Sequence, residues 1–500
     1  MQMLSLLGAG FERMWDPWLL VMCFAGTFAG TLVGVLPGLG PSAAIAVLLP
    51  LTYGSDPLVA LVSLAGIYYG AMYGGTITSV LLNVPGESAS VVTTYDGYPM
   101  ARQGRGGAAL GVAAIGSFIA GTMGLIFLTL VAVPLSKFAL DFGPPEYFAV
   151  MILAFVMVSS LARGNLIKCF LALFLGLLLS TVGQDVVSGA TRLTWGSTDL
   201  VDGVGFIPAV VGMFGMAEVI HDLINPSEFV ETPTQKIRVR DVFLTWADFR
   251  RSVGAMFRGG LLGFFVGILP GAGATIASFL SYGLERRLSK TPEKFGTGMI
   301  EGVAGPESAN NSASSGAFVP LLTLGIPGSS TTAVLIGAFV LLGIQPGPRM
   351  MTEHADVTWG LIASMYVGNV MLLAQNILLV PLFIWLLRVG RQVMPVIVAC
   401  ICVVGVYSID NSMWEVWIMV IFTALGYAFK SAGIPAAPLV IALVLGQSAE
   451  YSLRQSLVIS MGSPGIFFTR PICIVLFAIA LLCLTWPLIR DRMRGLEEAE

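Results

Sequence analysis

Two stretches of the chain, GVLPGLG at 34–40 and GILPGAG at 267–273, share the pattern G-x-L-P-G-x-G. In each, a Pro-Gly pair interrupts a run of apolar residues. Proline removes a backbone donor and glycine permits φ > 0, so a helix breaks at such a pair. In the second copy the apolar arms, 259–269 and 274–283, are too short to cross about 30 Å of hydrocarbon. The pattern predicts two re-entrant hairpins.

Further motifs recur in the same order, which indicates that the chain is built from two similar halves. The break LLNVPGES at 81–88 is matched by LTLGIPGS at 322–329. The pair Ala217–Glu218 is matched by Ala449–Glu450. Internal repeats of this kind build many transporters.

The repeat divides the chain into four expected parts. They are a first membrane repeat at 1–221, a cytoplasmic basic linker at 222–258, a second membrane repeat at 259–453, and a C-terminal transmembrane helix with a cytoplasmic tail at 454–500.

The composition places these repeats in a membrane. Of the 500 residues, 56% are hydrophobic and only 11% are charged, so a soluble fold could not bury the apolar surface whereas membrane lipid can solvate it. The net charge of −3 argues against a nucleic-acid partner. The chain has no P-loop, no H-E-x-x-H and no nucleophile–base set, so we expect no enzyme and no cofactor.

The basic residues predict the orientation. With the linker in the cytoplasm, most of the 26 Lys and Arg residues also fall on the cytoplasmic side. The first hairpin leads into GSDP at 54–57, without a basic residue, and the second into ERRLSKTPEK at 285–294, with four. These loops therefore lie on opposite sides. We expect an all-α integral membrane protein with two inverted-topology repeats, re-entrant hairpins and broken helices, plus one C-terminal transmembrane helix.

The helix breaks are the candidate binding site. Broken backbone at membrane depth is tolerated only inside protein or beside a wet cavity, and a helix that restarts after Pro-Gly directs free N–H groups and a positive end toward an anion such as a carboxylate. The substrate-binding candidates are Pro37, Gly38, Gly40, Pro270, Gly271 and Gly273 at the hairpin tips, and Asn83, Pro85, Gly86, Ser88, Pro327, Gly328, Ser329, Ser330 and Thr331 at the other breaks. The alternatives are packing kinks and hydroxyls bonded to their own helices.

A second group of oxygen-bearing residues is the candidate site for a coupling cation. Glu87 would repel an anionic substrate and its counterpart is Ser329, so it fits a Na⁺ or H⁺ better. Hard cations prefer oxygen ligands. The candidates are Glu87, Thr78, Asn310, Asn311, Ser312, Ser314 and Ser315, with an exposed polar loop as the alternative for the stretch 307–317.

Four strings carry a resemblance to a known family. GVLPGLGPSAA, YYGAMYGG, LLNVPGESAS followed by DGYPMARQGRG, and GPESANNSASSGAFVPLLTLGIPGS resemble the large TctA-type permease subunit of the tripartite tricarboxylate transporters. The resemblance implies a multi-pass permease of the bacterial inner membrane, without its own ATPase. It also implies two partners, a small four-helix membrane subunit and a periplasmic solute-binding protein, and uptake of citrate or other carboxylates driven by a Na⁺ or H⁺ gradient. A channel or the membrane subunit of an ATP-driven importer stays open as the alternative.

Overall fold

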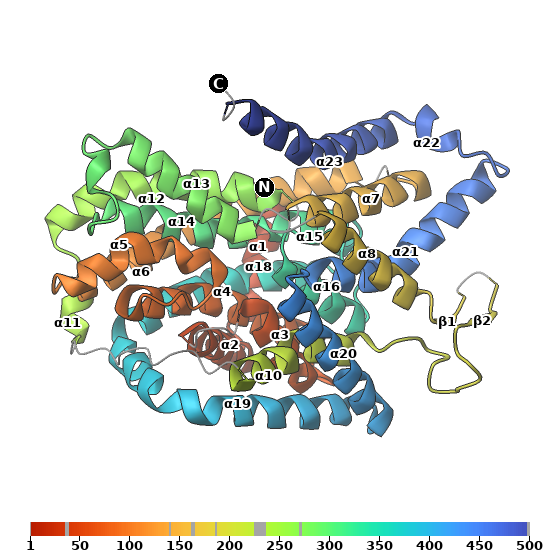
Figure 1. Cartoon of the computed structure of the whole chain (residues 1–500), viewed down its shortest axis with the longest axis horizontal. Coiled ribbons are helices and arrows are strands. Elements are labelled where there is room, and N and C mark those ends of the chain that lie inside the picture. Colours follow the sequence, from red (N-terminus) through yellow and green to blue (C-terminus); the bar gives the residue numbers. More distant parts are fainter. Residues whose placement is uncertain are drawn as a thin grey trace.

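Helices form almost all the regular structure in the computed structural model, which describes residues 2–35, 40–139, 142–161, 166–185, 188–224, 237–269 and 273–497 (Figure 1). Within these residues the strands form one antiparallel pair, β1 (Gly183–Gln184) with β2 (Thr191–Arg192). Five helices, α2, α4, α6, α18 and α20, are long and apolar enough to cross a membrane. The expected all-α, multi-pass membrane architecture is therefore confirmed.

The first half of the chain contains α1 (Gln2–Met14), α2 (Pro17–Val35), α3 (Pro41–Leu48), η1 (Leu49–Thr52), α4 (Pro57–Leu82), η2 (Ser88–Val91), α5 (Thr93–Arg102), α6 (Gly106–Ala139), α7 (Pro144–Leu161), α8 (Leu166–Ser180), α9 (Phe206–Val210), the π-helix η3 (Val211–Met216) and α10 (Ala217–Ile224). The second half contains α11 (Val239–Val242), α12 (Trp246–Ile268), α13 (Gly273–Leu288), η4 (Pro292–Lys294), α14 (Glu301–Gly316), α15 (Phe318–Leu324), α16 (Ser330–Leu341), α17 (Met350–Glu353), α18 (Ala355–Leu378), α19 (Val380–Asp410), α20 (Met413–Ala432) and α21 (Ala437–Ile459). Two helices follow, α22 (Ile466–Thr469) and α23 (Pro471–Glu497).

The first arm of the second predicted hairpin is longer than its apolar stretch suggests. α12 has 23 residues, about 35 Å at 1.5 Å per residue, and begins at Trp246, inside the expected linker. Thr245 caps it by accepting a hydrogen bond from the backbone N–H of Asp248, so its polar first turns remain helical. The helix is therefore long enough to span the hydrocarbon, but α12 is not among the helices apolar enough to cross a membrane, so the re-entrant hairpin stays a prediction. The hairpin tips themselves, with Pro37, Gly38, Pro270 and Gly271, lie outside the described residues.

Glycines allow two pairs of helices to pack with their backbones in contact. On α2, a Cβ atom added at Gly26 or Gly30 would lie 2.3 Å from a backbone carbonyl oxygen of α4, that of Ser63 or Ile67. On α12, a Cβ added at Gly263 would lie 2.2 Å from the carbonyl oxygen of Ala309 on α14. No side chain fits at these distances. The apolar bilayer gives helices little hydrophobic drive to associate, so close backbone packing between small residues holds these pairs together.

The two halves also contact each other reciprocally. α6 of the first half packs against α14 of the second, and α18 of the second half packs against α4 of the first. In the same way α16 packs against α3, and η2 packs against α13. Each half therefore completes the packing of the other, and the core lies where α4 and α14 are enclosed.

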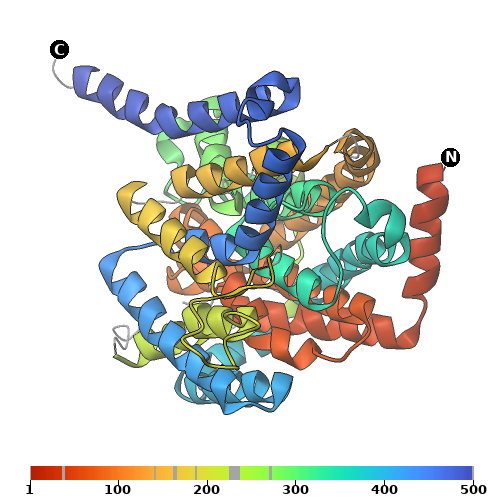
Figure 2. The same ribbon diagram turned by 90° about the vertical axis from the view of Figure 1, so that its right-hand side faces the viewer.

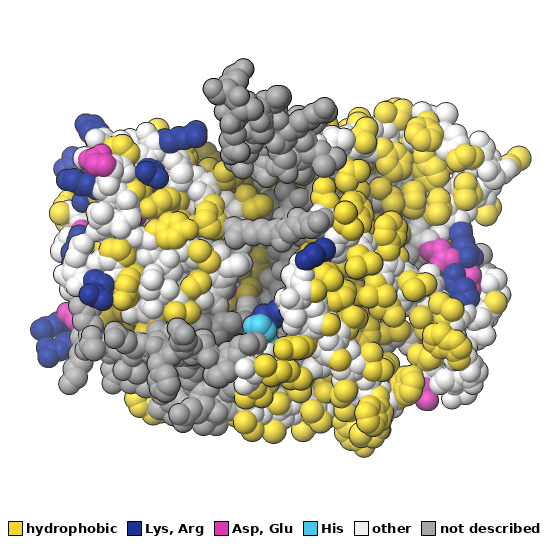
Figure 3. Space-filling view, in the orientation of Figure 1, with side chains coloured by type: hydrophobic (Ala, Val, Ile, Leu, Met, Phe, Trp, Pro, Cys, Tyr) yellow, Lys and Arg dark blue, Asp and Glu magenta, His cyan; other side chains and the backbone are white. Residues whose placement is uncertain are grey.

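The chain ends lie apart on the outside of this core. α23 runs along the top of the molecule in both ribbon views and packs against α7, whereas α1 stands at the edge in Figure 2 and packs against α18 (Figures 1 and 2). Hydrophobic side chains cover much of the face in Figure 3, and Lys and Arg gather at its left end, over the region of α5, α11, α12 and α13. This distribution fits lipid-facing walls and one strongly basic end.

We expect alanine at the close glycines to destabilise the fold. Gly30→Ala and Gly263→Ala should each lower the free energy of unfolding by about 1–3 kcal/mol, because the helices must separate to admit the methyl group. Thermal unfolding of the purified chain in detergent measures this. The matched control is Gly283→Ala on α13, where nothing lies within 4 Å and alanine should be neutral or stabilising. Equal melting temperatures for all three variants would contradict the packing described.

Candidate functional site

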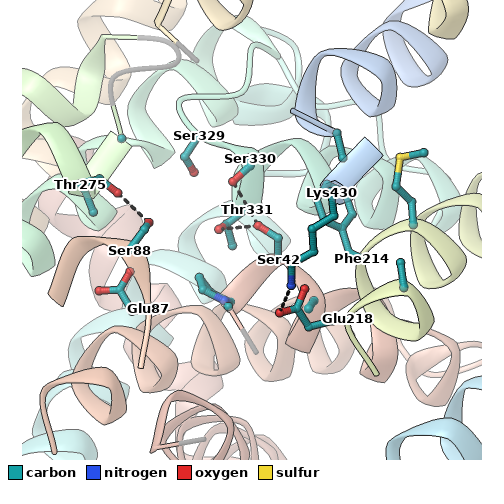
Figure 4. A pocket seen from close by; sticks show the side chains of 18 of the residues that line it. Ser42, Glu87, Ser88, Phe214, Glu218, Thr275, Ser329, Ser330, Thr331 and Lys430 are labelled. Carbon is teal, nitrogen blue, oxygen red and sulfur yellow. Dashed lines mark hydrogen bonds and ion pairs between the residues drawn. The ribbon is translucent and has the colours of Figure 1, made fainter. Parts of the chain in front are cut away.

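A cavity of about 560 Å³ lies between the two halves (Figure 4). Its wall is formed by α3, α4 and η2, by the helix that runs from η3 into α10, and by α13, α16 and α20. This volume lies within the 300–1,000 Å³ typical of small-molecule sites.

Three helices begin at the cavity wall. α3 starts after Gly40, α13 starts at Gly273, and α16 starts at Ser330 with Ser329 as its N-cap. The short 3₁₀ turn η2 begins there as well, at Ser88. The first backbone N–H groups of a helix have no partner within it and carry partial positive charge, so these ends favour an anion.

The two Pro-Gly breaks outside the hairpins have the same backbone path. α4 ends at Asn83 and α15 at Gly325, both in the left-handed conformation, with φ of 57° and 69°. After the Pro-Gly pair, Glu87 and Ser329 are both extended N-caps, with φ of −146° and −154°. The two breaks are thus equivalent structures that carry different side chains, a carboxylate and a hydroxyl.

Hydroxyl groups join the halves across the cavity (Figure 4). Ser42 Oγ on α3 lies 3.2 Å from Ser330 Oγ and 3.1 Å from Thr331 Oγ1 on α16. On the other side, Ser88 Oγ lies 2.8 Å from Thr275 Oγ1 on α13. In each contact a residue behind a G-x-L-P-G-x-G tip meets the first turn after the other half's Pro-Gly break, so the contacts are reciprocal.

A second reciprocal pair of contacts lies beside the first. Tyr68 of α4 places its hydroxyl 3.4 Å from Ser329 Oγ, and Asn310 of α14 donates from Nδ2 to Glu87 Oε1 at 3.3 Å. Glu87 also accepts the backbone N–H of Ala89 at 2.8 Å. The N-cap side chain of each half is therefore contacted by the long central helix of the other half.

One ion pair lines the cavity. Lys430 Nζ on α20 donates to Glu218 Oε1 on α10 at 2.6 Å, and Figure 4 shows the pair across from Glu87 and Ser88. Lys430 is the only cationic side chain on the cavity wall within the described part of the chain. The wall therefore combines helix N-termini and hydroxyls with one ion pair.

The structure brings many of the predicted site residues to this wall, and leaves others behind it. Those that line the cavity are Gly40, Pro85, Gly86, Glu87, Ser88, Gly273, Ser329, Ser330 and Thr331. Asn83 instead ends α4 as its C-cap, and Pro327 and Gly328 are buried beside the cavity, where a Cβ at Gly328 would lie 2.9 Å from Ala317 Cα.

The candidate cation ligands lie on the two central helices. Thr78 on α4 and Asn310, Asn311, Ser312, Ser314 and Ser315 on α14 are all buried. Because the stretch 307–317 belongs to α14 and its C-cap, its reading as an exposed polar loop was wrong. The stretch is buried because α14 packs between α6, α12 and α13, and the polarity of the sequence alone does not reveal this packing.

The sequence had not predicted several of the residues that line the cavity. Ser42 and Thr275 stand at the same distance behind the two hairpin motifs, in GVLPGLGPS and GILPGAGAT, so the repeat itself carried the signal. Glu218 stood out only as part of the repeated Ala-Glu pair, and Lys430 did not stand out at all, because the two come from distant helices and meet only in the folded chain.

Comparison with known proteins gives the class and then the family. The fold and the cavity are those of a multi-pass helical membrane protein, and the family match points to a transport role. The chain belongs to the tripartite tricarboxylate transporter TctA family, whose sequence profile matches residues 20–441. The resemblance stated from the motifs is thereby confirmed.

Two relatives from Agrobacterium vitis are similar to this chain. An uncharacterized 52.8 kDa protein in the TAR-I ttuC′ 3′ region is 45% identical over 490 residues, which are 98% of this chain and 97% of that protein. An uncharacterized protein in the TAR-II ttuC′ 3′ region is 42% identical over 227 residues, 45% of this chain and 94% of that protein. No solved structure matches the chain with statistical significance.

The geometry predicts which side chains are accessible from the cavity. With the native cysteines replaced by serine, Ser88→Cys and Ser330→Cys should react with a water-soluble thiol reagent, since both side chains are exposed at the cavity wall. Ser314→Cys, fully buried on α14, is the control and should stay unmodified. Mass spectrometry of the purified chain measures the modification, and rapid labelling at 314 together with protection at 88 and 330 would refute the described wall.

Proposed function

We propose that the chain is the permease subunit of a binding-protein-dependent secondary transporter that imports tricarboxylates or related organic anions, coupled to a Na⁺ or H⁺ gradient. The observation that carries this proposal is the convergence of the N-termini of α3, α13 and α16 on one cavity. Their N–H groups and the hydroxyls around them offer several donors to a ligand that bears several carboxylates.

The proposed substrate site comprises the two hairpin tips and the two other breaks. It contains Pro37, Gly38, Pro270 and Gly271 at the tips, and the hydroxyls of Ser88, Ser329, Ser330 and Thr331 at the wall. Neutral donors suit a transporter, because they bind an anion without the tight hold of several fixed charges. Ser42 and Thr275 join this set through their contacts with Ser330 and Ser88.

We further propose that the halves are inverted repeats, with the linker and C-terminal tail in the cytoplasm. Reciprocal packing of α6 on α14 and of α18 on α4 supports an internal two-fold relation. Ion pairs support the orientation, because each joins residues that the basic-residue rule places on one side. Inner pairs are Arg105–Asp248, Arg251–Glu301 and Arg258–Glu285, and outer pairs are Arg192–Glu450, Arg454–Asp185 and Arg470–Glu146.

The proposed assembly follows from the family. A tripartite transporter has further subunits, and we propose a small four-helix membrane subunit beside this chain and a periplasmic solute-binding protein that delivers the anion to a bacterial inner-membrane complex. Uptake in proteoliposomes separates the candidate functions. A secondary transporter accumulates the anion under an imposed Na⁺ or H⁺ gradient without ATP, an ATP-driven importer needs ATP, and a channel only equilibrates it.

A negative charge at the start of α16 tests the anion site. Ser330→Asp should weaken binding and uptake of a tricarboxylate by at least about tenfold, because a like charge about 4 Å away costs more than 1.4 kcal/mol at an effective dielectric constant of about 20. The fold should be unharmed, since an acidic residue stabilises a helix N-terminus. Ser330→Asn is the neutral control of similar size. Wild-type uptake by Ser330→Asp, with the thermal stability preserved, would exclude this end of α16 from the site.

Cysteine labelling tests the orientation. A membrane-impermeant maleimide should label Ser188→Cys, in the loop between β1 and β2, in intact spheroplasts. It should label Lys290→Cys, in the loop after α13, only after permeabilisation. The reverse pattern would invert the proposed topology, and labelling of both positions from outside would contradict it altogether.

A further inference from the structure

Glu307 on α14 is a fully buried carboxylate in the core of the protein, behind the cavity wall. Its Oε2 accepts a hydrogen bond from Thr76 Oγ1 at 2.6 Å, and its Oε1 accepts one from Thr93 Oγ1. Both threonines belong to the first half and Glu307 to the second. Among the described residues, no Lys, Arg or His forms an ion pair with it.

Two asparagines share a face of α14 with this carboxylate. Asn310 and Asn311 follow Glu307 by three and four positions, the spacing that places side chains on one helix face. Asn310 donates its Nδ2 to Glu87, and Asn311 donates its Nδ2 to Ser117 Oγ at 2.7 Å. With its Nδ2 directed at Glu87, Asn310 turns its Oδ1 away from that carboxylate.

Several oxygen atoms of α14 around these residues lack partners. Within the described part of the chain, Asn310 Oδ1 and Asn311 Oδ1 are buried without a hydrogen-bond donor, as are the hydroxyl oxygens of Ser308 and Ser312 on the same stretch. Leaving one buried acceptor unsatisfied costs about 1–3 kcal/mol. The two amide oxygens can only accept, so they are satisfied by a cation or a proton donor.

A small space lies behind the partners of two of these side chains. A second cavity, of about 10 Å³, is lined by Thr76 and Ser117, which bond Glu307 and Asn311, although Glu307, Asn310 and Asn311 do not line it themselves. That is about the smallest space that admits one water molecule. Glu87 connects Asn310 to the main cavity, because Glu87 lines that cavity and its carboxylate accepts a hydrogen bond from Asn310.

We propose that Glu307, Asn310 and Asn311 form a buried site for the monovalent cation that drives transport, Na⁺ or a proton, with Glu87 at its entrance. Two carboxylates in one buried network without a counter-charge are unstable unless a cation occupies it. The site spans both halves, because the hydroxyls of Thr76 and Thr93 complete it. Relative motion of the halves would therefore open it, which couples occupancy to transport. This proposal rests on the proposed function and adds the residue that holds the cation.

The test uses the whole transporter in proteoliposomes and compares net uptake with exchange. Glu307→Gln should lose net uptake under a cation gradient to background, yet retain exchange of labelled for unlabelled tricarboxylate, because exchange needs no release of the cation. Glu301→Gln, at the start of the same helix and paired with Arg251, is the control and should keep both activities. A Na⁺ gradient and a pH gradient imposed separately identify the occupant.

Two outcomes with folded Glu307→Gln overturn the proposal. One is gradient-driven uptake with wild-type cation dependence, and the other is loss of exchange together with uptake. Absence of exchange in the wild-type protein would instead refute the proposed function.

Thermal unfolding of the wild-type chain tests the site even if Glu307→Gln misfolds. If the occupant is Na⁺, the melting temperature of the wild-type chain in detergent should rise with Na⁺ but not with choline; if it is a proton, the melting temperature should rise as the pH falls. In either case the rise should be smaller in Glu307→Asp. A melting temperature indifferent to Na⁺ and to pH would also overturn the cation site.

Discussion

The structure depends on one constraint, that a backbone N–H or C=O group inside a bilayer must find a partner in the protein or in enclosed water. The described chain breaks its helices at Asn83 and Gly325 and starts three helices in the interior. The three helix starts are tolerable because they lie on the wall of one cavity, where hydroxyls and a bound ligand can satisfy their N–H groups. The cavity thus collects the N-termini of α3, α13 and α16, which have unpaired N–H groups.

Close packing gives this arrangement its rigidity. α2 and α4, and in the same way α12 and α14, touch through backbone atoms at Gly30 and Gly263, so each pair moves as one unit. The hydroxyl contacts across the cavity are weak by comparison, since each joins two side chains beside open space. Across the cavity the two halves therefore meet through side-chain hydroxyls, whereas away from it they pack directly, α6 on α14 and α18 on α4.

Much of this could be predicted from the sequence, because the motifs are local. The breaks at Pro85 and Pro327, and the helix starts that follow them, depend on the stereochemistry of proline and glycine alone. What escaped prediction depends on contacts between distant segments. Glu307 stands in a string whose polarity resembles a loop, and only its enclosure by α6, α12 and α13 marks it as buried. The start of α12 at Trp246 was missed because charged residues occupy the first turns of a helix as readily as they occupy a linker.

The near-equivalence of the two breaks has a consequence for how a ligand lies in the cavity. The hydroxyls of Ser88 and Thr275 occupy positions equivalent to those of Ser330 and Ser42. A ligand with two similar ends therefore meets almost the same donors in either direction, and the hydroxyls alone do not fix its orientation. Glu87 and Ser329 distinguish the two directions, because they occupy equivalent N-cap positions and only Glu87 can carry a charge. A carboxylate end is repelled from Glu87 and a hydroxyl end is attracted to it. The difference between Glu87 and Ser329 would thus fix the direction in which an asymmetric anion lies between two nearly equivalent sets of hydroxyls.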